Sequence, residues 1–584
     1  MPLDRHAADL LSDDATRPLD CERDSDCRLG CHCLDGGCAL IDPAADPTDG
    51  YCARGPAPTC MAVPDLVVET LEDRVDGSDG VRSLREALQE AASAAGPHRV
   101  TFAGALHRGE LTVDESLGPL PELGSLTYLD GAGVTLRAGG AGADLGLRLR
   151  GGGVVVSDLT LLGFTTAAIT VLPGTSDVHL FHLRVGDLGQ PPNGDGIAVH
   201  PGSRRVWIGR GRELACVDWS YLPLPADEQS FDVGSYDLNV IAANQGDGIR
   251  VEQASEVYIY GTWVGFDNLY PEGNQHDAPA WGNHQHGIHL IDVFDAVVGI
   301  QYLGASEGGG RAHDPLAAGV AVGRSGQGGV LIERGGEISM PGLILGDTPP
   351  MTIYDENSVF NLKIEDSAGP VVYGRPPGLG RQSSPLYSLS HSEGTLPIWV
   401  QGNQDEVLIW GLQNQCYYGA SCPDHAVVIE AAAAAVRIYH TTNLFDFRRA
   451  AIQVGSLLPG GSVEVVNNIF WDRAPSSVVA LEAGADTAEG VELRNNVLFN
   501  YGGWCLGDCP VLPTSNTVGD PDLCDFYYAL PQSPACAAVD TGEELRWSGL
   551  VLDRNGDREG TFNGCAPDLG ARECVSEPCL AACH

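Results

Sequence analysis

The chain has 584 residues, including 75 glycines and only 4 methionines, and its formal net charge at pH 7 is −44. This charge disfavours a nucleic-acid-binding protein, which needs a cationic face to displace counterions from phosphates, and it disfavours anionic membrane surfaces for the same reason. No stretch approaches the roughly 20 apolar residues that span a bilayer. The N-terminus has no basic region followed by an apolar core, so no signal peptide is visible.

The 18 cysteines gather at the two ends of the chain. Seven lie between Cys21 and Cys60 and eight between Cys505 and Cys583, whereas only three lie in the long stretch between these groups. The N-terminal group lacks the matched CxxC pairs of a zinc site, so we expect disulfide bonds, which persist in oxidising compartments. We therefore expect a secreted or cell-surface protein, although no signal peptide is visible.

The first sixty residues predict two segments without a hydrophobic core. Residues 1–20 are polar and acidic, and we expect a disordered leader there. Residues 21–60 combine cysteines with aspartates and glycines and have few apolar side chains. Such a segment needs cross-links to fold, so we expect a Cys-rich disulfide module.

Residues 61–109 predict a cap made of strands and one helix. Residues 65–68 (DLVV) are typical of a strand, and a helix is expected to begin after Ser83, with Ser83 as N-cap and Glu86 completing a capping box. Gly96-Pro97 ends it and a second strand begins at Val100. The SLREAL sequence resembles the CSLREA-type segment at the start of secreted parallel β-helix proteins. That resemblance implies an amphipathic helix that covers the open end of a solenoid.

Residues 110–504 predict a repeat architecture. The tripeptide Asp195-Gly196-Ile197 returns at 247–249, and again as His286-Gly287-Ile288. Short valine-rich runs recur at spacings of 27 to 29 residues, as in the following pairs: Val178 to Val206, Val407 to Val436, Val436 to Val463, and Val463 to Val491. This period favours one β-helix coil per repeat, because a β-propeller needs about 40–45 residues per blade. Asn468 and Asn496 predict an asparagine ladder at a turn.

Further resemblances support an all-β, right-handed parallel β-helix, the superfold of the pectate lyases. Residues 195–333 resemble the glycine-rich repeats of large secreted β-helix and haemagglutinin-like proteins. Regularity is expected to fail over 335–396, where proline-rich sequences predict imperfect coils with long loops. Within residues 505–584, the motifs at 520–523 (DPDL), 533–535 (SPA), 539–542 (VDTG) and 567–570 (PDLG) follow in order. They resemble the closing module of bacterial surface β-helices of the choice-of-anchor type, which implies export and not an activity, and its cysteines imply a Cys-rich, cross-linked module. Parallel crossovers are right-handed by general rule.

Acidic residues between 195 and 247 are the first candidate site. Stacked coils bring residues one period apart to within about 5 Å, so these carboxylates are expected to approach one another and to favour a cation. Calcium suits such oxygen ligands. The calcium candidates are Asp195, Asp227, Glu228 and Asp232, and the catalytic candidates are Asp195, Asp218, Asp232, Asp247 and Arg210. The alternative is that the repeated aspartate is a turn residue kept for geometry.

Two enzyme classes are compatible with these residues. Asp195-Gly196-Ile197 followed by Val206-Trp207-Ile208 resembles a pectate lyase segment, which implies a calcium-assisted polysaccharide lyase. Gly209-Arg210 replaces the expected Asp-His, however, and no base is identifiable. Asn193-Gly194-Asp195 and His286-Gly287 resemble parts of polygalacturonases, which implies a glycoside hydrolase, but no Arg-Ile-Lys follows.

Histidines and aromatic residues supply the remaining candidates. His284, His286 and His289 lie close enough in sequence to bind a transition metal, although a solvated loop is the alternative. Trp207, Tyr258, Tyr260 and Trp263 are candidates for exposed rings that stack on sugars, and the alternative is that some of them are core. From these observations we expect a secreted or surface β-helix protein that is structural, adhesive or polysaccharide-binding. The alternative is a lyase or glycosidase that acts on acidic polysaccharide.

Overall fold

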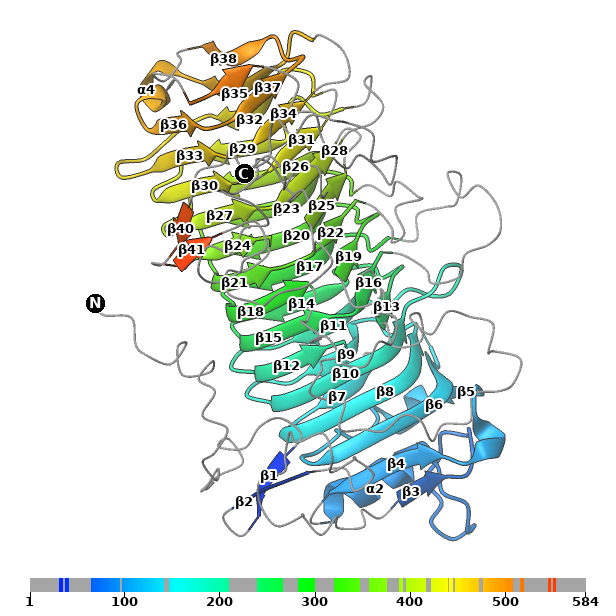
Figure 1. Cartoon of the computed structure of the whole chain (residues 1–584). Coiled ribbons are helices and arrows are strands. Elements are labelled where there is room, and N and C mark those ends of the chain that lie inside the picture. The colour runs from blue at the N-terminus through cyan, green and yellow to red at the C-terminus, as the bar shows by residue number, and fades with distance from the viewer. Residues whose placement is uncertain are drawn as a thin grey trace, which may run out of the picture.

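The computed structural model shows an elongated parallel β-helix in which successive coils stack along one axis (Figure 1). It describes residues 31–34, 37–40, 65–94, 97–140, 146–209, 239–265, 282–299, 320–346, 357–374, 388–391, 395–415, 422–439, 441–444, 447–471, 476–507, 515–518, 545–547 and 550–552. None of the helices within these ranges has the length and apolar character needed to cross a membrane. The predicted class, an all-β right-handed parallel β-helix, is confirmed.

Twelve parallel strands form the first sheet, one from each coil. In order they are β7 (Leu147–Leu149), β9 (Ala167–Val171), β11 (Asp195–Val199), β14 (Ile249–Glu252), β17 (His286–Ile291), β20 (Gly328–Glu333), β23 (Phe360–Glu365), β26 (Leu396–Gln401), β29 (Val427–Glu430), β32 (Ala450–Val454), β35 (Val479–Ala483) and β38 (Gly503–Gly507). Alternate side chains along these strands point into the solenoid, which is the period that the apolar residues follow.

Two further ladders complete each coil. The second contains β12 (Arg204–Ile208), β15 (Ser255–Tyr260), β18 (Phe294–Gly299), β21 (Gly336–Met340), β24 (Val371–Tyr373), β27 (Val407–Trp410), β30 (Ala435–Tyr439), β33 (Ser462–Val466) and β36 (Val491–Arg494). The third contains β13 (Asn239–Ile241), β16 (Thr262–Val264), β19 (Val320–Val322), β22 (Ile344–Leu345), β25 (Ser388–His391), β28 (Leu412–Gln415), β31 (Thr442–Leu444), β34 (Ile469–Trp471), β37 (Val497–Phe499) and β39 (Thr517–Val518). The longer strands β6 (Thr127–Ala138), β8 (Gly152–Leu162) and β10 (Ser176–Val185) precede them, and β10 pairs with both ladders.

The core is a set of apolar columns inside the solenoid. On the first sheet, Ile197, Ile249 and Ile288 are register partners in adjacent coils, and all three are fully buried. Burial of such a side chain stabilises the fold by about 1.5–3 kcal/mol. The four valine pairs predicted from the sequence spacing are direct register partners, so the repeat length is confirmed at these coils.

The predicted asparagine ladder is also confirmed. Asn468 Nδ2 donates to Asn496 Oδ1 at 3.0 Å, and Asn496 Nδ2 donates to Asn516 Oδ1 at 3.0 Å. Asn193, Asn244 and Asn283 form the same arrangement nearer the N-terminus, and they were not foreseen. In both ladders the amides satisfy buried backbone groups at the turns, which otherwise cost about 1–3 kcal/mol each.

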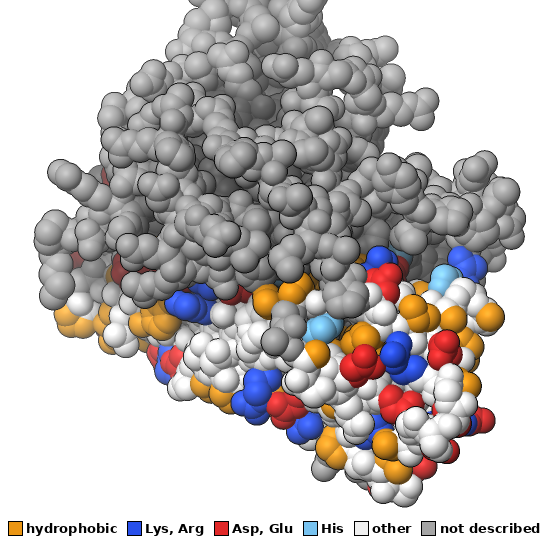
Figure 2. Space-filling view, turned by 90° about the horizontal axis from the view of Figure 1, so that it is seen from below, with side chains coloured by type: hydrophobic (Ala, Val, Ile, Leu, Met, Phe, Trp, Pro, Cys, Tyr) orange, Lys and Arg blue, Asp and Glu red, His pale blue; other side chains and the backbone are white. Residues whose placement is uncertain are grey.

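The N-terminal cap consists of β3 (Asp65–Val68), α2 (Leu84–Ser93), β4 (His98–Phe102) and β5 (Glu110–Val113), with short 3-10 turns η3 (Gly104–Leu106) and η4 (Glu115–Leu117). The capping box of Ser83 and Glu86 is present as predicted, and Leu84 and Leu88 are buried. Figure 2 views this end, where acidic and basic side chains lie interspersed over the part that is described. The helix therefore buries its apolar face against the solenoid and presents charge outward.

The remaining described elements are small. They are β1 (Cys31–Leu34) paired antiparallel with β2 (Gly37–Leu40), the short helix α4 (Ala485–Ala488), and β40 (Leu545–Trp547) paired antiparallel with β41 (Leu550–Leu552). Over residues 335–396, strands β21 to β26 continue the ladders without interruption. The predicted loss of regularity therefore does not extend to the strands. The proline-rich sequences of this stretch lie outside the described residues.

Candidate functional site

One edge of the first sheet aligns the recurring tripeptides. Asp195 begins β11, Asp247 lies two residues before β14, and His286 begins β17. The backbone N–H of Asp247 donates to Asp195 Oδ1 at 2.8 Å, and the N–H of His286 donates to Asp247 Oδ1 at 2.8 Å. Each aspartate thus accepts a hydrogen bond from a backbone N–H at the edge of the next coil, which gives the repeated aspartate a structural role.

The glycine of the tripeptide is required by the close stacking of coils. A Cβ at Gly248 would lie 2.6 Å from Asn283 Nδ2 and 2.7 Å from the Gly287 carbonyl oxygen. Gly196 and Gly287 meet the next coil in the same way. Glycine therefore recurs because the backbones of neighbouring coils leave no room for a side chain.

Asp247 lies between two imidazoles. Its Oδ1 is 3.0 Å from His286 Nδ1, and its Oδ2 is 3.0 Å from His289 Nδ1. The Arg250 guanidinium is 3.8 Å from Oδ2. Asp247 is fully buried, and both histidines are 8% exposed. We call Asp247, His286 and His289 the Asp-His-His cluster.

The two aspartates of this edge have pKa values shifted in opposite directions. Burial alone would raise the pKa of Asp247, but hydrogen bonds from His286 and His289 outweigh it and hold that pKa below its usual value. Burial raises the pKa of Asp195, and the neighbouring Asp247 carboxylate adds to this shift. Opposite shifts of adjacent carboxyl groups are typical of acid–base sites.

Neighbouring coils hold the imidazoles in place. The ring of His286 stacks on Phe360 at a centroid distance of 5.9 Å. Phe360 reaches across the intervening coil because Gly328 has no side chain, and a Cβ there would lie 2.2 Å from the Phe360 ring. On the other side, Glu333 Oε2 is 3.6 Å from His289 Nε2. The cluster is therefore built by four consecutive strands of the first sheet, β14 to β23.

Two rows of outward-facing side chains lead away from the cluster along the first sheet. The first row is Arg250, His289, Leu331, Lys363 and Trp399, and the second is Glu252, Ile291, Glu333, Glu365, Gln401 and Glu430. We call the two rows together the first-sheet strip. Trp399 is half-buried; its Nε1 donates to Glu430 at 3.2 Å, and Lys363 Nζ lies 4.3 Å from its ring centroid.

The structure combines two candidates that the sequence left separate. Asp195 and Asp247 are neighbours as stacking predicted, and His286 and His289 join Asp247 instead of forming a histidine site of their own. His284 is exposed, and it is not among the ligands of the cluster. The other candidates lie outside the described residues: Arg210, Asp218, Asp227, Glu228 and Asp232.

The sequence contains a signal for some of these residues beyond the candidates named above. The Asp-Gly-Ile and His-Gly-Ile motifs align Asp247 with His286, so a ladder drawn through Ile249 and Ile288 would have joined them. The same register places Arg250 beside His289. Trp399, Lys363 and Glu333 carried no motif, and only the coil register reveals them.

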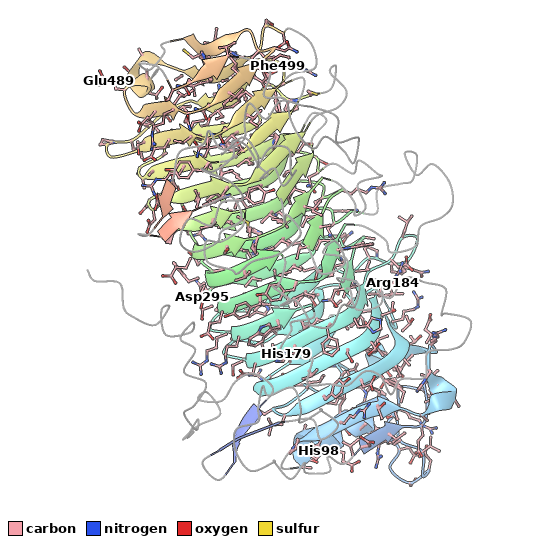
Figure 3. All side chains as sticks on the ribbon, viewed as in Figure 1. His98, His179, Arg184, Asp295, Glu489 and Phe499 are labelled. Atoms are coloured by element: carbon pink, nitrogen blue, oxygen red, sulfur yellow. The ribbon has the colours of Figure 1, made fainter. Side chains whose placement is uncertain are left out.

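The aromatic candidates lie on the second and third ladders. His179, Trp207 and Tyr258 stack face to face, with centroid distances of 4.7 and 5.1 Å. Trp207, Tyr260 and Trp263 are buried, which agrees with the alternative that some of these rings belong to the core. Burial lowers the pKa of His179 to about 4 (Figure 3 shows its position). These rings stabilise neighbouring coils in the manner of cross-strand pairs.

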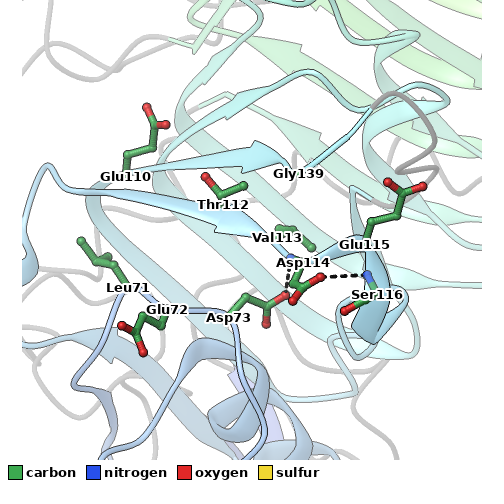
Figure 4. A pocket seen from close by; sticks show the side chains of 10 residues that line it. All are labelled: Leu71, Glu72, Asp73, Glu110, Thr112, Val113, Asp114, Glu115, Ser116 and Gly139. Atoms are coloured by element: carbon green, nitrogen blue, oxygen red, sulfur yellow. Dashed lines mark hydrogen bonds between the residues drawn. The ribbon is translucent and has the colours of Figure 1, made fainter.

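A hollow at the N-terminal cap is lined by acidic residues (Figure 4). Asp73 forms a buried ion pair with Arg85 of α2 at 2.7 Å, and it also accepts the N–H of Asp114. Asp114 in turn accepts the N–H of Ser116, and hydrogen bonds from the side chain and then the backbone of Ser116 lower the pKa of Asp114. Because these carboxylates hold the cap to the first coils, we assign the hollow a structural role.

Comparisons with solved structures find parallel β-helix proteins of low similarity. Pectate lyase Pel9A is 13% identical, with 73% of this chain and 88% of that chain covered and a TM-score of 0.33. PfbA, a surface adhesin of Streptococcus pneumoniae, is 11% identical, with 72% of this chain and 86% of that chain covered and a TM-score of 0.30. A mutant tailspike protein of E. coli bacteriophage HK620, in complex with pentasaccharide, is 9% identical, with 74% of this chain and 76% of that chain covered and a TM-score of 0.24. No family model matches the chain, and no curated protein matches it in sequence. At this similarity the comparisons carry no argument about activity.

Proposed function

We propose that this is an exported β-helix protein that binds polysaccharide along the first-sheet strip. The observation that supports this most is the alignment of a half-buried tryptophan with a row of carboxylates across consecutive coils. Adjacent strands lie about 4.8 Å apart, which is close to the length of one sugar unit in a chain. A glycan laid along the strip therefore meets one outward-facing pair of side chains per coil.

Trp399 is the proposed stacking platform. Its indole combines a large apolar surface with an N–H that Glu430 fixes at 3.2 Å, so the ring is held in one orientation before a ligand arrives. The apolar C–H face of a sugar packs on such a ring. Carboxylates beside it, such as Glu365 and Glu430, accept hydrogen bonds from sugar hydroxyl groups.

The charge of the strip favours a neutral or amine-bearing polysaccharide. Arg250 bonds to Glu252 at 2.7 Å and Lys363 to Glu365 at 2.8 Å, so both of its cations are already paired. Glu333 and Glu430 add further negative charge to the same face. A polyuronate would meet repulsion here, and the protein's net charge of −44 increases it. This differs from the acidic polysaccharide of the alternative prediction, a lyase or glycosidase.

Disulfide bonding supports export. Cys422 and Cys505 are both disulfide-bonded, and such bonds persist in oxidising compartments. A secreted or surface location is therefore part of the proposal.

Binding to a panel of neutral, amino-sugar and uronate polysaccharides tests the proposed function. We expect retardation of the protein in gels that contain a neutral or amino-sugar polymer, and Trp399→Ala should weaken this binding at least about fivefold through lost stacking. The matched control is Gln453→Ala, which removes an outward-facing residue of the same row two coils further on. Equal binding by both variants and the wild type would refute the role of the strip, and so would binding to uronates alone.

An enzyme remains the second candidate, because Asp195, Asp247 and Arg250 converge at one end of the strip. Incubation with the same panel distinguishes the two enzyme classes, because a lyase produces unsaturated ends that absorb ultraviolet light and a glycosidase produces reducing ends alone. The assay is run with and without calcium, since the calcium prediction rests largely on residues outside the described ranges. Absence of product from every polymer that binds would remove the enzyme candidate.

A further inference from the structure

We propose that the Asp-His-His cluster binds a divalent transition-metal cation of the zinc class. One carboxylate oxygen of Asp247 and one ring nitrogen from each of His286 and His289 all lie within 4.8 Å of one another. Zinc binds nitrogen and oxygen ligands at about 2.0–2.2 Å, so two ligands of one ion lie roughly 3 Å apart. His286 Nδ1 lies 3.0 Å from Oδ1 of Asp247 and His289 Nδ1 lies 3.0 Å from Oδ2, so each imidazole has one carboxylate oxygen at this spacing.

The type of ligand selects the metal. Two imidazole nitrogens with one carboxylate suit zinc, cobalt, nickel or iron, whereas calcium and magnesium prefer oxygen ligands alone. The site therefore differs from the calcium site predicted from the acidic residues. It also differs from the three-histidine site, because Asp247 takes the place of His284.

The surroundings of the ligands are those of a metal site. His289 Nε2 is buried and has no hydrogen-bond partner, although Glu333 Oε2 lies 3.6 Å away. With Nδ1 on a cation, the ring proton resides on Nε2 and faces this carboxylate. Metal-bound histidines almost always donate their second ring N–H to a carboxylate, a carbonyl or water, which fixes the ring and raises its basicity. Glu333 is the carboxylate next to this nitrogen, just beyond hydrogen-bond distance.

Contacts between coils also hold the ligand side chains in place. The N–H of His286 donates to Asp247 Oδ1, and the Phe360 ring stacks on His286, so both residues are fixed by the coil stacking. Asp195 lies beside the cluster and adds negative charge that attracts a cation, whereas the charge of Arg250, 3.8 Å from Asp247 Oδ2, is balanced by its partner Glu252. His286 and His289 lie on β17 and Asp247 lies two residues before β14, the neighbouring strand, and sites built on such rigid elements hold their geometry well.

Titration of the chelator-treated full-length protein with Co²⁺ tests this site without any polysaccharide, so its outcome is independent of the proposed function. We expect one equivalent to give the visible absorption bands of nitrogen and oxygen ligation, and Zn²⁺ to displace it. Glu333→Gln removes a neighbour of a ligand and should weaken Co²⁺ binding roughly 10–100-fold. His286→Gln and His289→Gln each remove a ligand and should weaken Co²⁺ binding by more than this.

Two histidines serve as controls. His284→Gln changes an exposed histidine next to the cluster, and His425→Gln changes a histidine that pairs with Glu482 at 3.0 Å elsewhere on the first sheet. Both variants should bind Co²⁺ as tightly as the wild type, and circular dichroism should show that all variants are folded. Equal Co²⁺ affinity in the wild type, His286→Gln and His289→Gln would overturn the proposal. A wild type that binds Ca²⁺ but not Co²⁺ or Zn²⁺ would overturn it as well.

Discussion

The first sheet has two regions that share one core but differ in their coil lengths. From β11 to β26 the aligned core residues are Ile197, Ile249, Ile288, Val330, Leu362 and Ile398, which lie 52, 39, 42, 32 and 36 residues apart. From β26 to β38 they are Ile398, Val427, Ile452, Leu481 and Cys505, which lie 29, 25, 29 and 24 apart. The apolar column is continuous through both regions, so the additional residues of the long coils are accommodated outside the core.

The edge position of the sheet differs in the same way. In the long-coil region it carries Asp195, Asp247 and His286, followed by Gly328 and Phe360, whereas in the uniform region it carries His425, Ala450, Val479 and Gly503. Small apolar residues also fit this edge, so a polar side chain is not required in every coil. The two regions differ in what these polar residues meet: Asp247 lies between His286 and His289 of the next coil, whereas His425 pairs with Glu482 two coils away. The candidate site therefore lies where the coils are long.

The largest expected effect tests whether the asparagine ladders stabilise the two regions equally. Asn468→Ala in the uniform region and Asn244→Ala in the long-coil region each leave several buried groups without partners. We expect each variant to lose about 3 kcal/mol or more of unfolding free energy, measured by urea denaturation. A much smaller loss for Asn244→Ala would show that the long-coil region is held together differently.

The stacked rings of His179, Trp207 and Tyr258 are expected to make the folded protein less stable at acidic pH. The pKa of His179 is lowered to about 4 by burial, with Asp177 opposing the shift. The unfolded chain, with a histidine pKa near 6.5, takes up a proton that the folded chain does not, so stability falls as pH falls from about 6.5 to 4. His179→Phe keeps a stacking ring and should remove about 2–3 kcal/mol of the stability lost between pH 7.5 and 4.5. Identical pH profiles for the variant and the wild type would contradict this.

The smallest effect concerns the glycine column. Gly248→Ala forces a Cβ to within 2.7 Å of the neighbouring coil's backbone, and we expect it to cost about 1–3 kcal/mol. Gly503→Ala is the matched control in the uniform region, where a Cβ meets nothing within 4 Å, so its change should stay within about 0.5 kcal/mol. Thermal unfolding of both variants checks the difference. A neutral Gly248→Ala would mean that the glycine is not needed for stacking.

Much of the fold could be predicted from the sequence because each coil repeats the same local requirements. Valines at one period became register partners, and Ser83 with Glu86 became a capping box. The site was harder to predict, because its members lie 39 and 42 residues apart across coils of unequal length. A fixed period does not connect Asp247 with His289, and only the stacking register does. The ion pair of Arg85 with Asp73 was hard to predict for another reason, because Asp73 lies in the segment before the helix and no helical spacing relates the two residues.

Hydrogen–deuterium exchange with and without the bound polysaccharide tests most directly whether function resides in the long-coil region. We predict that the ligand slows exchange of first-sheet amides in β14, β17, β20, β23 and β26, and leaves β32, β35 and β38 unchanged. Protection confined to the uniform region, or to the other two ladders, would contradict the account.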